Sequence, residues 1–326
     1  MKEEDIRPVE IFNKYLQLAK EDCINFFNGE AKNEFKCPVH HHAKCIDIFT
    51  KHGFSYKECE ICSSIFVSPR HDLSVYEDFY LNGNSVKFWS KEFYKKTEEA
   101  RKSKLWRPKV EDLSKSKFLD FSIDKYSIID IGGGYGAFAE IIKEKNPKNI
   151  YVIEPNRELA NICRNKGIKV IEKFSHELKD TDLPKGPKII TSFELFEHLY
   201  DPKEFIISLR RLMDKGDILY MTTLTSSGLD IKELKKESKA INPPYHINFL
   251  SVKGIEEFLI NEKFTSINIS TPGKLDMDII RNQKNSIKNE LLITIIENFC
   301  DQSLKDFQNL IAKNKMSSHM LIEAKL

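Results

Sequence analysis

Short apolar runs alternate with segments of helical periodicity along the second half of the chain. Ile128, Ile129 and Ile131 form one run, which ends at glycines and is followed by apolar residues at helical spacing. Such a run is typical of a strand that is buried on both faces of a parallel sheet. Further runs of this kind lie at residues 151–153, 188–193, 217–224, 264–270 and 319–324. The pattern therefore predicts an α/β fold.

Helical periodicity also marks both ends of the chain. Residues 6–28 indicate an amphipathic helix, Asp201 and Pro202 are typical of a helix start, and residues 275–313 are largely helical by periodicity. The apolar face expected for this last segment consists of Leu291, Leu292, Ile295 and Ile296. The segment either shapes a substrate site or an oligomer contact, or covers a sheet edge. We expect four parts: a helix at 1–35, a small module at 36–70, a helical lid or connector at 71–120, and a main domain at 121–326 with an insertion at about 274–316.

Composition narrows the classes of function. The 326 residues include 51 basic and 49 acidic side chains, which are intermixed, and the net charge is +2. This balance gives no electrostatic footprint for long nucleic acid or for an anionic membrane. No apolar run is long enough to cross a bilayer, and the first residues are too acidic for a signal peptide. We therefore expect a cytoplasmic protein, in which the seven cysteines would not form disulfides.

The turn after the first apolar run has the composition of a nucleoside site. Asp130 is followed by glycines at 132, 133, 134 and 136, and Glu154 ends the next apolar run. Glycines let the backbone turn tightly and let a ligand approach closely, and the N–H groups that open a helix attract polar ligand atoms. A carboxylate at the Glu154 position can accept hydrogen bonds from both ribose hydroxyls. The glycine spacing alone also fits a dinucleotide site.

Three further features separate these cofactor classes: Asp130 two residues before the first glycine, the turn Pro155-Asn156 after Glu154, and the block 188–202. With them, residues 120–270 resemble the class I S-adenosylmethionine (SAM) dependent methyltransferases. The resemblance implies a Rossmann-like sheet of seven strands, whose last strand at residues 319–324 is inserted antiparallel at the edge. It also implies that SAM is contacted by Asp130, Gly132, Gly133, Gly134, Tyr135, Gly136, Glu154, Pro155, Asn156, Phe193 and Glu194.

A cysteine and histidine cluster precedes this region. Cys37 and His40 form a C-x2-H pair, and Cys59 and Cys62 form a C-x2-C pair after eighteen intervening residues. Two tight turns that present paired soft ligands are typical of a zinc ribbon, and metal binding would drive its folding. His41, His42 and Cys45 are alternatives to His40 as the fourth ligand. The competing interpretation is a group of buried thiols beside an exposed histidine run.

The segments around this cluster resemble a group of SAM enzymes that methylate sugars linked to nucleotides, in which a zinc module precedes the SAM domain. The resemblance rests on the run Ile65–Arg70 and on the aromatic-rich stretch Tyr76–Arg107. This stretch could form a lid over SAM, with Arg107 binding the methionine carboxylate by a charge-assisted pair. Alternatively, it is a helical connector whose aromatic side chains pack in the core.

Methyl transfer to a hydroxyl requires a base, because the proton must leave as the new carbon–oxygen bond forms. His198 follows the strand at 188–193, and His246 follows the strand at 217–224, so both are candidates at the carboxyl ends of strands. Tyr245 is a third candidate catalytic residue. Against these roles, His198 could cap or pack the next helix, and Tyr245 and His246 could only shape a wall.

The sequence supports three hypotheses about function. The first is a methyltransferase that acts on a hydroxyl of a sugar-like small molecule. The carbon-methylating relatives carry a longer carboxy-terminal domain, so the resemblance favours oxygen. The second is an RNA base methyltransferase with a zinc ribbon, which the near-neutral charge disfavours. The third is a binding protein that keeps the zinc and SAM sites without turnover.

Overall fold

The structure is a computed structural model that describes residues 2–326. The chain divides into two compact units, which are treated separately below. Unit 1 comprises Met1–Glu98, Leu224–Ile255 and Ser270–Met320, and unit 2 comprises Glu99–Thr223, Glu256–Ile269 and Leu321–Leu326.

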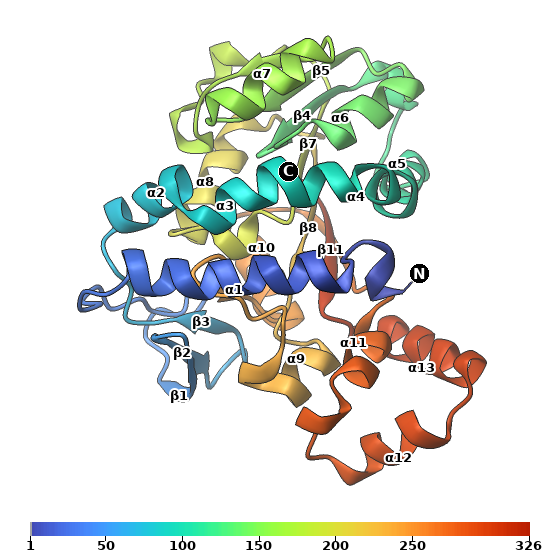
Figure 1. Cartoon of the computed structure of the whole chain (residues 1–326). Helices are drawn as coiled ribbons and strands as arrows, with labels where there is room; N and C mark the ends of the chain where they lie inside the picture. The colour runs from blue at the N-terminus through green and yellow to red at the C-terminus, as the bar shows by residue number, and fades with distance from the viewer. Residues whose placement is uncertain (1) are drawn as a thin grey trace. The chain divides into compact units, whose positions relative to one another are not determined.

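A seven-stranded sheet, most of which belongs to unit 2, has the order β10-β11-β8-β7-β4-β5-β6. Figure 1 labels its strands β4, β5, β7, β8 and β11. The strands are β4 (Ser127–Ile131), β5 (Asn149–Ile153), β6 (Lys169–Ile171), β7 (Lys188–Phe193), β8 (Ile218–Leu224), β10 (Ser266–Ser270) and β11 (His319–Lys325). The five strands from β8 to β6 pair in parallel. This is the Rossmann-like α/β fold of SAM-dependent methyltransferases, as the sequence predicted.

The last strand, β11, runs antiparallel to β8. Thr225 N donates to Ser318 O over 2.9 Å beyond one end of this strand pair, and Leu326 N donates to Asp217 O beyond the other. The prediction that this strand lies at the sheet edge was wrong, because β10 takes the edge and β11 lies between β10 and β8.

Burial explains why the central strands were visible in the sequence. Every residue of β4, β7 and β8 is buried, so these strands lack the polar alternation of a half-exposed sheet. On one face, Val110 and Leu113 of α5 and Phe138 of α6 form a core cluster with Ile128 of β4. The helices of this region are α5 (Arg107–Ser114), α6 (Ala137–Ile142), α7 (Arg157–Asn165), α8 (Pro202–Leu212) and α10 (Val252–Asn261).

Side-chain caps fix where two of these helices begin. Asn156 Oδ1 accepts hydrogen bonds from Glu158 N and Leu159 N at the start of α7. Asp201 Oδ1 accepts from two backbone N–H groups of α8, whose first residue is Pro202. Each such cap contributes about 1 kcal/mol to the stability of the protein. The predicted helix start at Asp201-Pro202 is confirmed.

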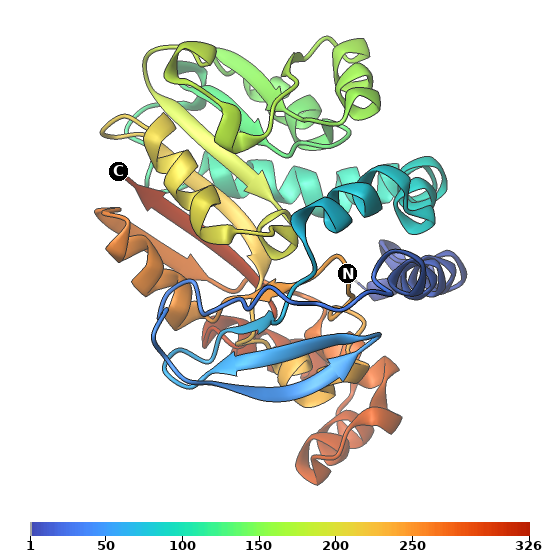
Figure 2. The same cartoon turned by 90° about the vertical axis from the view of Figure 1, so that its left-hand side faces the viewer.

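Unit 1 contains a four-stranded antiparallel sheet in the order β1-β2-β3-β9. Its strands are β1 (Cys45–Lys51), β2 (Phe54–Cys59), β3 (Ile65–Val67) and β9 (Asn248–Phe249). The hairpin of β1 and β2 is drawn in blue in Figure 2. The remaining α-helices within residues 2–326 are α1 (Val9–Phe26), α2 (Leu73–Asn82), α3 (Asn84–Phe88), α4 (Tyr94–Arg101), α9 (Leu229–Leu234), α11 (Asp276–Asn282), α12 (Glu290–Asn298) and α13 (Asp301–Lys313).

The largely helical character predicted for residues 275–313 is confirmed by α11, α12 and α13, which share an apolar cluster. Leu292 and Ile296 of α12 are buried in this cluster, as predicted. Leu291 was wrongly assigned to the buried face, because its side chain is 69% exposed.

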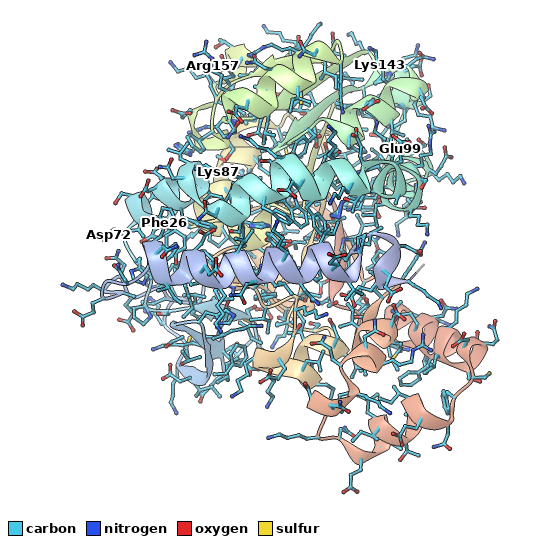
Figure 3. All side chains as sticks on the ribbon, viewed as in Figure 1. Phe26, Asp72, Lys87, Glu99, Lys143 and Arg157 are labelled. Atoms are coloured by element: carbon cyan, nitrogen blue, oxygen red, sulfur yellow. The ribbon has the colours of Figure 1, made fainter. Side chains whose placement is uncertain are left out.

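Charged residues of both signs are exposed over both units. Asp72 and Lys87 belong to unit 1, and Glu99, Lys143 and Arg157 belong to unit 2 (Figure 3). Within residues 2–326, no helix has both the length and the apolar character that crossing a bilayer requires.

Candidate functional site

The loop between β4 and α6 has a backbone that requires glycine. Gly134 has a φ of +55°, which side chains rarely tolerate. A Cβ on Gly133 would lie 2.7 Å from Asp130 Oδ2 and 2.9 Å from Val152 Cγ1. The loop therefore packs closely against the ends of β4 and β5, where a ligand can reach the backbone N–H groups.

Glu154 anchors this loop from the carboxyl end of β5. Its Oε2 accepts a hydrogen bond from Gly134 N and its Oε1 accepts one from Asn156 N, both over 3.0 Å. The side chain is 7% exposed, and burial raises the pKa of the carboxyl group, against the effect of the two hydrogen bonds. The carboxylate is therefore fixed beside the glycine loop, where ribose hydroxyls could donate to it.

Asp130, the last acid before the glycines, is buried between two strands. Its Oδ1 accepts a hydrogen bond of 2.8 Å from Thr191 Oγ1 of β7. Burial raises the pKa of Asp130 to about 7, and the negative charge of Glu154 adds to this shift. Asp130 is therefore only partly ionised at neutral pH. A nearby cation would increase the ionised fraction.

Glu194 follows β7 in a left-handed backbone conformation with a φ of +51°. Such a conformation is uncommon in residues other than glycine and is concentrated at functional sites. Its Oε1 accepts hydrogen bonds from Thr222 Oγ1 over 2.7 Å and from Lys109 Nζ over 3.3 Å. The sequence analysis missed Lys109, which belongs to none of the motifs.

Glu197 and His198 lie in the short turn between β7 and α8. Glu197 is buried, and its Oε2 accepts a hydrogen bond of 2.7 Å from Thr223 Oγ1. Burial raises the pKa of Glu197 to about 8, and the charge of Glu194 contributes to this shift. His198 is half-buried. It is not the cap of α8, because Asp201 takes that role, and its catalytic role stays a prediction.

Four other predicted cofactor residues have different surroundings. The exposed Arg107 forms a two-bond ion pair with Glu144, with distances of 2.8 and 3.0 Å. Phe193 is buried against the ring of Phe138, which places its side chain in the core. Tyr135, in the glycine loop, is half-buried and Pro155 is exposed. The pairing of Arg107 with Glu144 does not favour its predicted role as a carboxylate ligand.

Tyr245 and His246 belong to unit 1. Tyr245 is 6% exposed, its hydroxyl lies 2.7 Å from Ser85 Oγ, and burial raises its pKa. This geometry favours a structural role for Tyr245 over catalysis. His246 is half-buried, and its Nδ1 lies 2.6 Å from Ala240 O. Since a carbonyl only accepts, Nδ1 carries the proton, and a neutral ring has its lone pair on Nε2.

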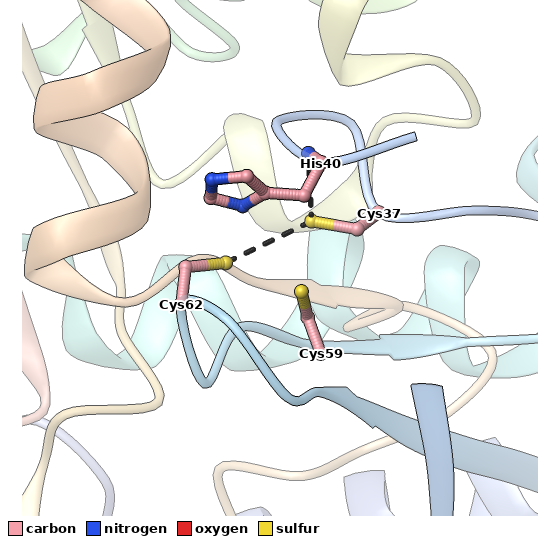
Figure 4. Close-up of side chains that lie close together, drawn as sticks. All are labelled: Cys37, His40, Cys59 and Cys62. Carbon is pink, nitrogen blue, oxygen red and sulfur yellow. Dashed lines mark hydrogen bonds between the residues drawn. The ribbon is translucent and has the colours of Figure 1, made fainter. Parts of the chain in front are cut away.

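The predicted zinc ligands come together in unit 1. The candidate ligand atoms of Cys37, His40, Cys59 and Cys62 all lie within 4.8 Å of one another (Figure 4). The three cysteine side chains are at most 2% exposed. His41 and His42 are exposed and outside the cluster.

Two turns position these ligands. In the first, His40 N donates to Cys37 Sγ over 3.4 Å and Ala43 N donates to His40 O. In the second, Ser63 N donates to Cys59 O over 2.8 Å. Cys45, a predicted alternative ligand, has its thiol near Ala43 O at 3.6 Å.

The distances suit a tetrahedral zinc ion. Zinc–sulfur bonds of about 2.3 Å in a tetrahedron place two sulfurs about 3.8 Å apart. Cys37 Sγ and Cys62 Sγ are 3.7 Å apart. Their hydrogen bond lowers the pKa of the Cys62 thiol to about 4 and, together with burial, raises the pKa of Cys37. The donor set of three sulfurs and one imidazole fits a structural zinc site.

The parallel sheet, the acid and glycine loop after β4 and the second acid after β5 define a SAM-dependent methyltransferase domain. The chain belongs to the methyltransferase domain family, whose profile matches residues 97–264. A ubiquinone biosynthesis O-methyltransferase of Colwellia psychrerythraea is 28% identical over 119 residues, which are 35% of this chain. The matched region spans 46% of that relative, about half its length.

Two solved structures have a similar fold. A SAM-dependent methyltransferase from Archaeoglobus fulgidus is 16% identical with a TM-score of 0.45, over 78% of this chain and 100% of that one. The plantazolicin methyltransferase BamL, solved with S-adenosylhomocysteine, is 13% identical with a TM-score of 0.49, over 77% of this chain and 93% of that one. Both likenesses concern the fold alone.

Proposed function

We propose that this SAM-dependent methyltransferase transfers the methyl group of SAM to a hydroxyl of a small, sugar-like molecule. The name of the Colwellia relative, an O-methyltransferase, supports oxygen as the acceptor atom. The net charge of +2 disfavours a long nucleic acid as substrate. The sugar-like character rests on the resemblance of residues 65–107 to enzymes that act on nucleotide-linked sugars.

SAM supplies a methyl group that its sulfonium charge has already activated. The chain's own residues would bind and align it: Glu154 by its carboxylate at the ribose, and the N–H groups of the glycine loop by contact with polar ligand atoms. Asp130 adds a buried acid beside the loop. Alignment of the reacting atoms is the main contribution of the protein to such a displacement.

The observation that best supports a hydroxyl as the methyl acceptor is the tautomer of His246. Because Nδ1–H donates to Ala240 O, the neutral ring has its basic nitrogen at Nε2. A base is required to take the hydroxyl proton as the new bond forms. His246 and His198 are the two candidates for this role.

The experiment combines an acceptor screen with a histidine variant. SAM consumption is measured with sugars, nucleotide sugars, phenols and RNA, and the best acceptor is used for His246→Asn. Asparagine keeps an N–H donor for Ala240 O but provides no base. We expect a kcat about 100- to 10,000-fold lower with unchanged SAM affinity, whereas His176→Asn, at an exposed site, keeps full activity. Undiminished turnover by His246→Asn would exclude it as the base.

We also propose that Cys37, His40, Cys59 and Cys62 bind one zinc ion that stabilises unit 1. Four protein ligands leave no open position, so the ion would have a structural role. Metal analysis should find about one zinc per chain, and Cys59→Ser should lose it. Cys45→Ser is the matched control, because Cys45 is a neighbouring cysteine outside the cluster. A folded wild-type protein without metal would refute the zinc site.

A further inference from the structure

A basic pocket of about 290 Å³ lies at the amino ends of β5 and β6 in unit 2. Three lysines line it: Lys143 follows α6, Lys148 precedes β5, and Lys169 begins β6. Figure 3 labels Lys143. None of the described residues that line the pocket is an aspartate or a glutamate. The pocket therefore presents positive charge without a carboxylate of its own.

Ion pairing separates these three lysines from their neighbours in the chain. Lys145 Nζ lies 2.7 Å from Glu111 Oε1, and Lys166 Nζ lies 2.9 Å from Glu140 Oε2. Neither of these two paired lysines lines the pocket. Within residues 2–326, the three lysines of the pocket have no carboxylate at ion-pair distance. An anion bound between them would offset their mutual repulsion.

Lys169 is held in place by groups that leave its charge unpaired. Its Nζ donates to Asn149 Oδ1 over 3.2 Å and lies 5.1 Å from the ring centroid of Tyr151. Asn149 is fixed in turn, because its Nδ2 donates to Ser127 Oγ over 3.1 Å. A lysine ammonium group has three N–H donors. Two of them remain for a ligand in the pocket.

The turn before β6 brings Lys143 to the same place. Gly167 lines the pocket and has a φ of +70°, and a Cβ on it would lie 3.6 Å from Lys143 Nζ. Because Gly167 is only two positions before Lys169, the end of α6 and the start of β6 direct ammonium groups to one pocket. Its apolar lining comes from Pro147, Ile150 and Ile168.

We propose that this pocket binds a phosphate group, and that a small organic phosphate is the ligand which its apolar lining favours. A phosphate group carries close to two negative charges at neutral pH, and lysine binds it as a compact point charge. Three lysines thus suit a phosphate better than a single carboxylate. The volume of about 290 Å³ is at the lower limit for small-molecule sites, so the ligand is small.

The basic pocket and the proposed SAM site lie at opposite ends of β5. Asn149 is the first residue of this strand, and Glu154 follows its last residue. Five residues at about 3.3 Å each separate the two by about 16 Å. A small phosphate in the basic pocket is therefore not the methyl acceptor, and the proposal holds for any acceptor.

Calorimetry on the full chain with inorganic phosphate, glucose 1-phosphate and glucose tests the proposal. We expect both phosphates to bind and glucose not to bind, with or without saturating S-adenosylhomocysteine. The triple variant Lys143→Met, Lys148→Met, Lys169→Met should weaken phosphate binding about 10- to 100-fold, since each exposed charge contact changes affinity about 2- to 5-fold. All three side chains are exposed, so the variant should keep the fold. Lys145→Met, which removes a paired lysine beside the pocket, is the matched control and should keep full affinity.

The outcomes separate the two sources of phosphate from a failure of the site. Tighter binding of glucose 1-phosphate than of inorganic phosphate supports an organic ligand, whereas tighter binding of inorganic phosphate overturns that part and leaves the free ion as the ligand. A wild type that binds neither phosphate, or a triple variant with unchanged affinity, would overturn the site. Equal losses in the triple variant and in Lys145→Met would show only a general effect of charge. Competition by S-adenosylhomocysteine would place the phosphate at the cofactor site instead.

Discussion

Replacement of Glu154 by alanine tests the cofactor site most directly. The carboxylate joins two segments by accepting hydrogen bonds from Gly134 N and Asn156 N, and it is 7% exposed. Alanine removes both acceptors and leaves two half-buried N–H groups without these partners. The variant therefore affects the stability of the protein and its affinity for SAM by separate routes.

The two effects have different magnitudes. An unsatisfied buried donor costs about 1 to 3 kcal/mol, so the free energy of unfolding should fall by about 2 to 4 kcal/mol if water partly replaces the lost acceptors. A hydrogen bond to a charged group contributes about 1.5 to 3 kcal/mol. Loss of the ribose contact should therefore weaken SAM binding about 10- to 100-fold. Glu154→Gln keeps one acceptor oxygen and should lie between wild type and Glu154→Ala in both measurements.

Calorimetry gives the SAM affinity, and urea unfolding without ligand gives the stability. Glu158→Ala is the control, because this exposed side chain lies in the same turn region at the start of α7. Unchanged SAM affinity in a folded Glu154→Ala protein would show that the ribose contact has been misplaced. In the wild type, SAM should raise the thermal midpoint and NADH should not.

The remaining predictions concern metal and pH. A zinc chelator should lower the thermal midpoint of the wild type but not that of Cys59→Ser, because only the former has a metal to lose; equal shifts would argue against the site. SAM affinity should rise relative to that of S-adenosylhomocysteine between pH 6 and 8, because the sulfonium cation favours ionised Asp130 and Glu197, whose pKa values burial raises to about 7 and about 8; a constant ratio in calorimetry would contradict this. Asp230 is fully buried beside Asp276, and burial raises its pKa. Its protonated form therefore contributes to the stability of the fold below the unfolded pKa of about 4, and this contribution is lost as pH rises. Asp230→Asn should flatten this decline in urea unfolding, and a steeper decline would refute the assignment.

The central strands were visible in the sequence because their burial leaves little choice of residue. β4 and β7 are buried along their whole length, so their apolar runs are continuous. The third parallel strand, β6, was not predicted, because its three residues are exposed or half-buried and include Lys169. β9 has only two residues and exists as a strand through its pairing with β3, a contact that local periodicity cannot encode.

The candidate site likewise contains residues that are close in sequence and could be predicted, and residues that meet only through packing. Glu154 and Gly134 are 20 positions apart and belong to one strand–helix–strand motif, so their chemistry could be predicted together. Lys109 meets Glu194 and Thr222 over separations of 85 and 113 positions. Its position depends on the packing of α5, which no motif records. The sequence does not tell which of three consecutive histidines is the fourth candidate zinc ligand. The backbone of the first turn places His40 in the cluster.

The charges of unit 2 give a physical reason for the choice of cofactor. Three acids, Asp130, Glu194 and Glu197, are within electrostatic reach of a single lysine, Lys109. Burial raises the pKa of Asp130 and of Glu197, so these two acids keep protons that a nearby cation would displace. A ligand with a sulfonium and an ammonium group offsets this repulsion, whereas the product has lost the sulfonium charge. On the proposed placement of SAM, these acids would bind SAM more tightly than S-adenosylhomocysteine and would so favour release of the product after transfer.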